Sequence, residues 1–560
     1  MGSEMCIRDS MHTFRYGVNA FVVYMLFGGL TFEDGIVVSE SFARKMKVST
    51  VEEHRDVVKL EFDKNICRVE AAGDNKFKIK LRDGKNYVLA CECDEGRKLV
   101  HGDFILALKR GERVEKRYLR YPSYYPGIME KVKIMSLRKL NNRALVIDVE
   151  YLVKVEKPLR VGDKLTGRHG NKGVVSAVLS DDEMPEVFVD GKWQRVEVIF
   201  SPLSVVSRMN LGQLLETHVG LLVKKKGYKN VWEPFEKVDL ERVRDGLRDL
   251  GADNLGRFRI RFQGKEFRGT AGYQYILRLD HCVGDKLHVV RMARPFVLTN
   301  QPLKGRKRFG GQRFGEMEFW TLFDHNALRI AERFAGLNVR DSGEDRTLLV
   351  VRIILATLGF MITSNGVLKK VGCKKALVGI RKELEGILER KELEDFVDNL
   401  CDYLEQCTGN VIFGKNLWKF LTGAVNNPPE IDRNTRERLI KLISGKEGFI
   451  RDGLLAKRLH RSGRAVIVPA PDLDVDRVYL PLEFAVEWYG EWTNMKDFEK
   501  RKILEGDSAE RQRWVCTFNE LAKSKKPLVL LNRQPSLHRH SIQAFHPLFW
   551  TERAIGLPIM

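Results

Sequence analysis

The sequence has few cysteines, and they lack the spacing of a metal site. It contains nine cysteines in 560 residues. Cys91 and Cys93 form a C-x-C pair, but no second pair follows at the spacing of a structural zinc site. The same holds for Cys401 and Cys407. We therefore expect no zinc site, and an odd number of cysteines without a disulfide framework is typical of the reducing cytosol.

The sequence also lacks a segment long and apolar enough to span a bilayer. The apolar stretch 18–30 is too short and contains Gly28 and Gly29. A second stretch, 348–362, is interrupted by Arg352 and predicts a buried helix.

There is no Walker A spacing, which disfavours an ordinary P-loop NTPase.

Acidic residues are outnumbered by basic ones. Lys and Arg total 96 against 75 Asp and Glu, so the formal net charge is +21. Such an excess attracts polyanions, and nucleic acid is the commonest partner of a large basic protein. The charge alone is equally compatible with a soluble protein that is basic but does not bind nucleic acid.

Periodicity and turn residues predict a mixed α+β, multidomain fold. We expect strands at 19–24, 36–39, 57–62, 77–81, 144–155 and within 259–300. Helices are expected at 211–223 and 235–250, and the spacing of apolar residues predicts an amphipathic helix over 370–405. Residues 445–560 are expected to form loops and strands.

A basic, glycine-rich loop is the strongest candidate for chemistry. Residues 162–176 read GDKLTGRHGNKGVVS, so that Lys164, Arg168, His169 and Lys172 alternate with glycines. Glycines let the backbone approach a ligand closely, and cations there suit phosphate oxygens. A solvated basic loop is the alternative.

This loop resembles the signature loop of the bacterial RNA polymerase β subunit, and Asn171 is typical of the bacterial branch. Similar segments occur in the same order at 32–40, 101–109, 201–216, 279–290 and 308–320. Segments 453–473 and 529–547 instead resemble the β′ subunit. The chain is identified as an incomplete part of a bacterial-type multisubunit DNA-directed RNA polymerase, with fused β and β′ parts.

The resemblance implies a double-psi β-barrel of the β type, the start of a second, β′-type barrel, a flap-like insertion and helical connectors. The expected segments are 1–16 (foreign or unmatched), 17–50 (start of the β-type barrel), 51–130 (flap-like insertion), 131–220 (barrel core with the phosphate-contacting loop), 221–262 (charged helical insertion), 263–335 (β C-terminal part), 336–444 (helical connector) and 445–560 (start of the β′-type barrel).

The resemblance also assigns roles at the active centre. Lys164, Lys172 and Arg208 would contact the RNA 3′ end and the triphosphate. His281 and Lys286 would approach the same centre, and Arg533 would probe the substrate ribose. Glu33 and Asp34 could assist a second metal through water, but neighbours in a strand point to opposite faces, so at most one would face the site.

Other basic residues are expected to bind nucleic acid through backbone phosphates. They are Arg168, His169, Lys457, Arg458, Arg461, Arg464, Lys304 and Arg308. A different pattern, the alternating Asp472, Asp474 and Asp476, could share one face of a strand; we do not expect them to bind metal.

RNA polymerisation requires Mg²⁺ held by carboxylates. In the family an aspartate-rich loop follows the Arg533 segment, whereas this sequence stops at Met560, so we expect the main ligands beyond it and an inactive isolated chain. Expected partners are the DNA template, the RNA transcript, nucleoside triphosphates, the rest of β′ and an α-type assembly platform, with no membrane, in a cytoplasmic, nucleoid-associated complex. The alternative is a noncatalytic nucleic-acid-binding remnant.

Overall fold

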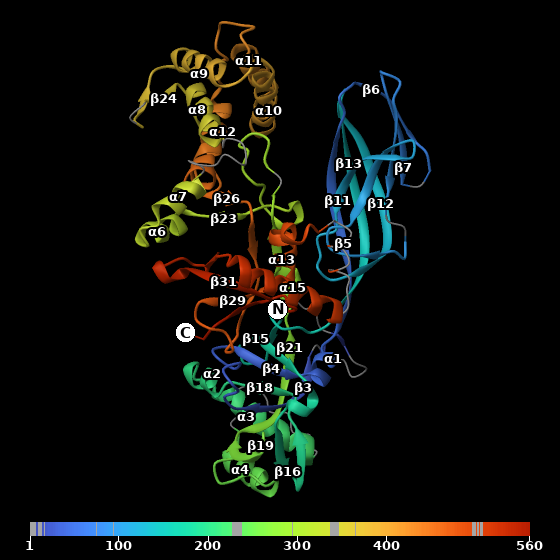
Figure 1. The fold of residues 1–560 in the computed structure, drawn as a ribbon, viewed down its shortest axis with the longest axis vertical. Coiled ribbons are helices and arrows are strands. Elements are labelled where there is room, and N and C mark those ends of the chain that lie inside the picture. Colours follow the sequence, from blue (N-terminus) through green and yellow to red (C-terminus); the bar gives the residue numbers. More distant parts are fainter. Residues whose placement is uncertain are drawn as a thin grey trace. The chain divides into compact units, whose positions relative to one another are not determined.

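The computed structural model describes residues 7–8, 14–15, 17–73, 75–92, 95–226, 238–293, 295–335, 346–363, 366–495, 500, 503 and 508–559. These residues form two compact units. Figure 1 shows their helices and strands, coloured along the sequence. Unit 1 comprises Met1–Leu287, Arg464–Leu528 and His546–Met560, and unit 2 comprises His288–Gly463 and Val529–Phe545. Of the N-terminal segment 1–16 only the strand pair β1 (Ile7–Arg8) and β2 (Phe14–Arg15) is described; the rest lies outside the described residues.

A closed six-stranded barrel lies at the centre of unit 1. Its order is β14-β15-β4-β18-β3-β21, and the pairs β15·β4 and β18·β3 are parallel. The strands are β3 (Val18–Tyr24), β4 (Gly35–Ser39), β14 (Lys164–Thr166), β15 (Gly173–Leu179), β18 (Val198–Phe200) and β21 (Ala271–Arg278). The strands predicted at 19–24 and 36–39 are confirmed; the double-psi connectivity stays a prediction.

Strand β3 explains why residues 20–24 are continuously apolar. Val22 packs in one buried cluster, whereas its neighbours Phe21 and Val23 pack in another on the opposite face. A strand buried on both faces needs apolar side chains at every position, because successive residues alternate. The apolar stretch that begins at residue 18 is therefore barrel strand.

A helix and a small sheet cover this barrel. Helix α3 (Leu211–Lys226) lies against β21 so closely that a Cβ on Gly272 would come within 2.1 Å of the Thr217 carbonyl oxygen. The sheet has the order β17-β16-β19-β20. Its strands are β16 (Glu186–Val189), β17 (Lys192–Arg195), β19 (Phe258–Phe262) and β20 (Lys265–Gly269). The other helices of this part of unit 1 are α1 (Glu40–Lys45), α2 (Pro202–Ser207), α4 (Leu240–Asp249) and α5 (Val283–Lys286).

A β-rich module of unit 1 spans residues 48–157. One sheet has the order β5-β13-β12-β9 and the other β11-β10-β8-β7-β6, with a shared core that includes Tyr121, Tyr125 and Tyr151. The strands are β5 (Val48–Glu61), β6 (Ile66–Ala71), β7 (Lys76–Leu81), β8 (Asn86–Cys91), β9 (Lys98–Leu99), β10 (Phe104–Arg110), β11 (Arg113–Arg120), β12 (Gly127–Asn141) and β13 (Ala144–Lys157). The expected borders at 50/51 and 130/131 fall inside β5 and β12.

The last part of unit 1 contains helices that the sequence did not predict. Helices α13 (Leu482–Tyr489) and α15 (Ser508–Lys525) accompany strands β28 (Ile467–Pro469), β29 (Arg477–Pro481) and β32 (Ile555–Leu557). The expectation of loops and strands over 445–560 was therefore incomplete, because short apolar runs such as 482–489 fit a helix or a strand equally well.

Unit 2 contains a helical module with its own core. Its helices are α8 (Thr347–Thr357), α9 (Cys373–Ile387), α10 (Arg390–Thr408), α11 (Val411–Leu421) and α12 (Arg433–Ile443). The single helix expected over 370–405 is two helices, and the helix expected over 348–362 ends at Thr357. Gly359 follows with φ of +88°, and the chain continues as β24 (Phe360–Ile362), paired with β25 (Leu368–Lys370).

The remaining elements of unit 2 are α6 (Glu316–Asp324), α7 (Leu328–Ala335), β22 (His288–Val290), β23 (Gln312–Phe314), β26 (Lys457–Leu459) and β30 (Val529–Asn532). Strands β27 (Ser462–Arg464) and β31 (Ile542–Trp550) run from one unit into the other. Asp472, Asp474 and Asp476 lie in turns before β29, so the idea that they share a strand face is wrong. None of the helices that the structure describes is long and apolar enough to cross a membrane.

Candidate functional site

The glycine-rich loop connects β14 to β15 and has a fixed shape. The Gly167 amide donates to Oδ1 of the buried Asn171 at 3.0 Å. A Cβ on Gly167 would lie 2.6 Å from that oxygen, so the close contact requires glycine. Gly170 has φ of +69°, which also favours glycine. The loop therefore presents Lys164 and Lys172 at its two ends in a defined geometry.

A buried ion pair lies directly behind this loop. The Asp163 carboxylate contacts the Arg278 guanidinium at 2.8 Å, and both side chains are buried. Asp163 also accepts hydrogen bonds from the Val283 amide at 2.7 Å and the Arg160 amide at 3.0 Å. These bonds fix β14 next to residues 278–283, the segment that precedes Lys286.

Four of the predicted site residues come together there: Lys164, Lys172, His281 and Lys286. We call them the cation cluster. The Leu279 amide donates to the Lys164 carbonyl oxygen at 3.0 Å. Burial, followed by the charges of Lys172 and Lys286, lowers the pKa of Lys164. Burial, then Lys286 and the other two lysines, also lowers the pKa of His281, which keeps it neutral near pH 7. Such mutual repulsion favours binding of a polyanion.

Arg208 and Asp34 form a separate pair. Arg208, after α2, donates to both carboxylate oxygens of Asp34 at 2.6 and 2.8 Å, and each side chain is about 40% exposed. Glu33 and Asp34 lie in the turn before β4, with Glu33 at φ of +50°, so the expectation of a strand was wrong. Because Asp34 is already neutralised by Arg208, it is a poor direct ligand for a metal.

A glutamate that the sequence did not single out fixes the outer part of the loop. Glu216 on α3 accepts hydrogen bonds from Arg168 at 2.6 Å and from the Tyr275 amide at 3.0 Å, and it contacts His169 Nε2 at 2.6 Å. Arg168 is therefore oriented and partly neutralised, and the same carboxylate orients His169. No spacing in the sequence links these residues, which lie 47 and 48 positions from Glu216.

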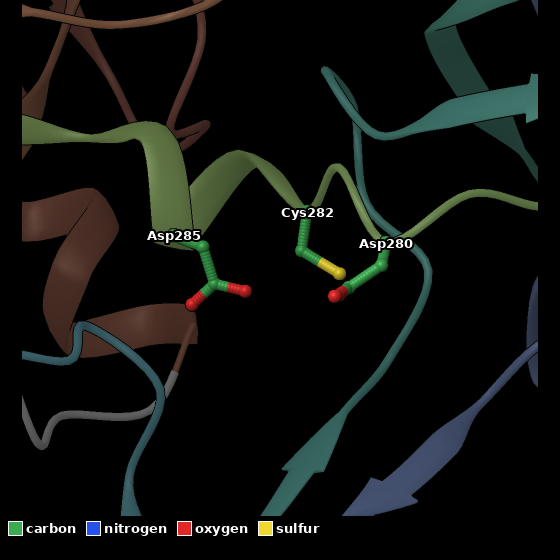
Figure 2. Close-up of side chains that lie close together, drawn as sticks. All are labelled: Asp280, Cys282 and Asp285. Atoms are coloured by element: carbon green, nitrogen blue, oxygen red, sulfur yellow. The ribbon is translucent and has the colours of Figure 1, made fainter. Parts of the chain in front are cut away.

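The described residues do not assemble a convincing Mg²⁺ site. Figure 2 shows the group that comes nearest, Asp280, Cys282 and Asp285, whose ligand atoms lie within 4.8 Å of one another. Burial raises the pKa of the Cys282 thiol to about 11, and Asp285 forms an ion pair with Lys157 at 2.7 Å. Mg²⁺ prefers several oxygen ligands, whereas this group offers a protonated thiol, one carboxylate that is already paired and the single further carboxylate of Asp280.

The predicted nucleic-acid contacts of unit 2 have varied surroundings. Arg533 is exposed just after β30, and its amide donates to the Ser541 carbonyl oxygen at 2.9 Å. Arg458 is nearly buried and pairs with Asp452 at 3.2 Å. Lys304 pairs with Glu447 at 3.3 Å on the surface. Arg308 and Arg461 are exposed, and Lys457 is half-buried. Arg464, which belongs to unit 1, is also exposed. Their nucleic-acid contacts stay predictions.

Unit 1 also contains a buried charge network that the sequence did not predict. Glu483 on α13 is 1% exposed and accepts hydrogen bonds from Arg511 and Arg553, each at 3.1 Å. Burial alone would raise the pKa of Glu483, but the two arginines lower it to about 2. The Arg553 guanidinium lies 5.5 Å from the centre of the Tyr125 ring. The network thus connects the last part of unit 1 with the β-rich module.

The geometry defines a basic multidomain protein whose closed barrel presents a cation cluster suited to phosphate groups. The family model described as RNA polymerase Rpb2, domain 6, matches residues 3–308. This is more than half of the chain, which therefore belongs to that family.

Three similar proteins are each named DNA-directed RNA polymerase subunit beta. The protein of Oenococcus oeni is 31% identical over 344 residues, which is 56% of this chain and 28% of the relative. The proteins of Alkaliphilus metalliredigens and Clostridioides difficile are 34% and 33% identical over 347 residues, covering 56% of this chain and 27% of each relative. The chain thus spans only about a quarter of the length of these relatives.

Proposed function

We propose that this chain is a β/β′-type large-subunit part of a DNA-directed RNA polymerase and takes part in DNA-templated transfer of nucleotides to an RNA 3′ end. The cation cluster of Lys164, Lys172, His281 and Lys286 is the observation that carries the proposal. The similar proteins carry that enzyme name, which supports the substrate class.

In this proposal the cluster binds the phosphates of the incoming nucleotide and the RNA end. The 3′-hydroxyl attacks the α-phosphate, and pyrophosphate leaves. Lys164 and Lys172 offset the negative charge that develops on the phosphate oxygens, because fixed cations stabilise a charged transition state without reorganisation. His281, which is neutral, donates a hydrogen bond to a phosphate oxygen and adds no positive charge. The loop geometry set by Gly167 and Asn171 keeps the two lysines in place.

The join of β-type and β′-type segments is the second element of the proposal. Val161 and Val283, from the part similar to β, pack in one cluster with Val468 and Ala554, from the part expected to resemble β′. The Glu483 network reaches Tyr125 in the same unit. Both contacts support a barrel-type partnership of the two segments within one polypeptide.

We further propose that the carboxylates for Mg²⁺ come from polypeptide outside this sequence, since the described residues do not fit the ion. When it is bound, Mg²⁺ supplies positive charge that stabilises the attacking oxygen and the leaving pyrophosphate oxygen. Glu33 remains a candidate for assistance through water. The other proposed partners are the DNA template, the RNA transcript, nucleoside triphosphates, the remaining β′ sequence and an α-type platform.

Charge reversal tests the proposal. In an assembly completed with the missing subunits, the double variant K164E/K172E should lose nucleotide addition by at least about 100-fold, since two transition-state contacts are reversed. The control K192E/K265E changes the same charge at two exposed lysines on β17 and β20 and should keep the activity. Primer extension measures both, and circular dichroism checks folding. Normal extension by K164E/K172E would defeat the assignment.

The noncatalytic remnant predicts a different outcome. An assembly with the unaltered chain would then bind DNA but extend no primer, and both double variants would behave alike.

A further inference from the structure

A lysine-rich segment of the helical module has no role in the proposal above. Residues 360–382 contain six lysines and arginines but no aspartate or glutamate. The segment lies beyond residue 308, where the match to the family model ends. It comprises the β24·β25 hairpin and the first part of α9, all within unit 2.

The fold places five of these lysines on the surface. Helix α9 buries Ala376, Leu377, Ile380 and Leu384 in the core of the module, so the other face is exposed. Strand β25 is exposed along its whole length. We call the resulting set, all of it exposed, the lysine patch: Lys369, Lys370, Lys374, Lys375 and Lys382.

No acidic residue is found to neutralise this patch within the part of the chain that the structure describes. The nearest acids along α9 are already engaged, because Glu383 pairs with Arg352 and Glu385 pairs with Arg381. The first turn of α9 contains Lys374 and Lys375 but no acid. Cations there oppose the helix dipole, so a bound anion would relieve an unfavourable arrangement.

The residue types in the patch indicate which kind of anion it would bind. Lysine binds phosphate as a point charge without reading bases. Surfaces for single strands add aromatic rings on which bases stack. The one aromatic residue of 360–382, Phe360, is half-buried against the core of the module. The patch therefore suits a continuous row of backbone phosphates.

We propose that the lysine patch binds the phosphate backbone of double-stranded DNA without sequence preference. The inference rests on the proposed function only for the choice of nucleic acid as the partner class. It adds a DNA contact on a module that the family match does not cover.

The test uses the full chain and a short fluorescently labelled DNA duplex. In the variant K369A/K370A/K374A/K375A, affinity at low salt should fall at least about ten-fold. The slope of log affinity against log salt should become shallower by about 3 to 4, because each lost phosphate contact contributes about 0.9. Fluorescence anisotropy over a salt series measures both quantities.

A matched control removes the same charge from the same module. Lys415, Lys419, Lys441 and Lys446 are exposed on or beside α11 and α12. Their replacement by alanine should leave affinity within about two-fold and the slope within about 1. Thermal melting of both variants checks that the module stays folded.

Several results would overturn the inference. An unchanged slope in the patch variant would do so, as would an equal loss in the control, which indicates a general charge effect. Loss of binding to single-stranded DNA or to anionic phosphatidylserine vesicles with duplex binding intact would assign another partner. Because K164E/K172E retains the patch, failure of primer extension and failure of duplex binding can be told apart.

Discussion

The chain presents lysines in two very different settings. Lys164 and Lys172 extend from a loop whose backbone is fixed by Asn171 and by the buried pair of Asp163 and Arg278. The lysine patch instead rests on an exposed hairpin and the exposed face of one helix. Chemistry on a phosphorus atom needs cations held in place, whereas holding a duplex needs only charge density. This difference in support is why we propose a reaction site for the first set and a binding surface for the second.

Removing the support behind the cation cluster should have the largest effect. Arg278→Met leaves the buried Asp163 carboxyl without its cationic partner, and breaking such a buried pair costs about 3–5 kcal/mol of unfolding free energy. Urea denaturation measures the loss. Arg433→Met breaks the exposed Arg433–Glu437 pair of α12 and should change stability by less than about 0.5 kcal/mol. Equal effects of the two variants would remove the contrast between the regions.

A glycine comparison gives the next largest effect. Gly167→Ala places a Cβ 2.6 Å from Asn171 Oδ1 and should cost about 1–3 kcal/mol and weaken nucleotide binding. Gly386 on α9 has no atom within 4 Å of the added Cβ. Gly386→Ala should therefore stabilise the helical module by about 0.5–1 kcal/mol. Thermal melting together with a fluorescent nucleotide titration tests both, and a harmless Gly167→Ala would show that the loop is adaptable.

The Glu483 network predicts a dependence on acid. The pKa of the Glu483 carboxyl is lowered from 4.5 to about 2 in the folded protein. The contribution of Glu483 to the free energy of unfolding is therefore complete above pH 4.5 and is lost as the pH falls toward 2. Arg511 and Arg553 then remain buried without their anion. Glu483→Gln should be less stable than the unaltered chain at pH 7, and the gap should narrow over this range. Denaturation at several pH values tests it; a constant gap would contradict it.

The smallest expected effect is on His281. Burial and the three lysines lower its pKa, so Lys286→Ala should raise that pKa toward its usual value. Lys382→Ala in the lysine patch should leave it unchanged. Titration of the histidine ring signals by NMR distinguishes the two variants, and identical titration curves would mean that the cation cluster does not act on His281.

The sequence predicted the barrel strands β3 and β4 because a strand buried on both faces has a continuous apolar run, as at 20–24. The short strands β14 and β18 and the strand β15 after the glycine-rich loop were not predicted. The cation cluster followed from a resemblance, not from spacing, since more than 100 positions separate Lys164 from His281. Glu216 and Glu483 could not be predicted, because their partners are distant in the chain and carry no shared pattern. Glu33 and Asp34 were treated as neighbours in a strand, but they lie in the turn before β4, where the alternation of strand side chains does not apply.

Unit 1 is discontinuous along the polypeptide, and this has a consequence for synthesis. Residues 161 and 554 share one buried cluster, yet almost four hundred residues lie between them. During translation the barrel strands, which end at residue 278, and the helices of unit 2 can pair with near neighbours, whereas the cluster around Val161 must wait until residue 554 leaves the ribosome. A chain whose synthesis stops before residue 554 would have a finished helical module but an incomplete cover over Val161 and Val283. Quality-control proteases could recognise such a product by that exposed apolar surface.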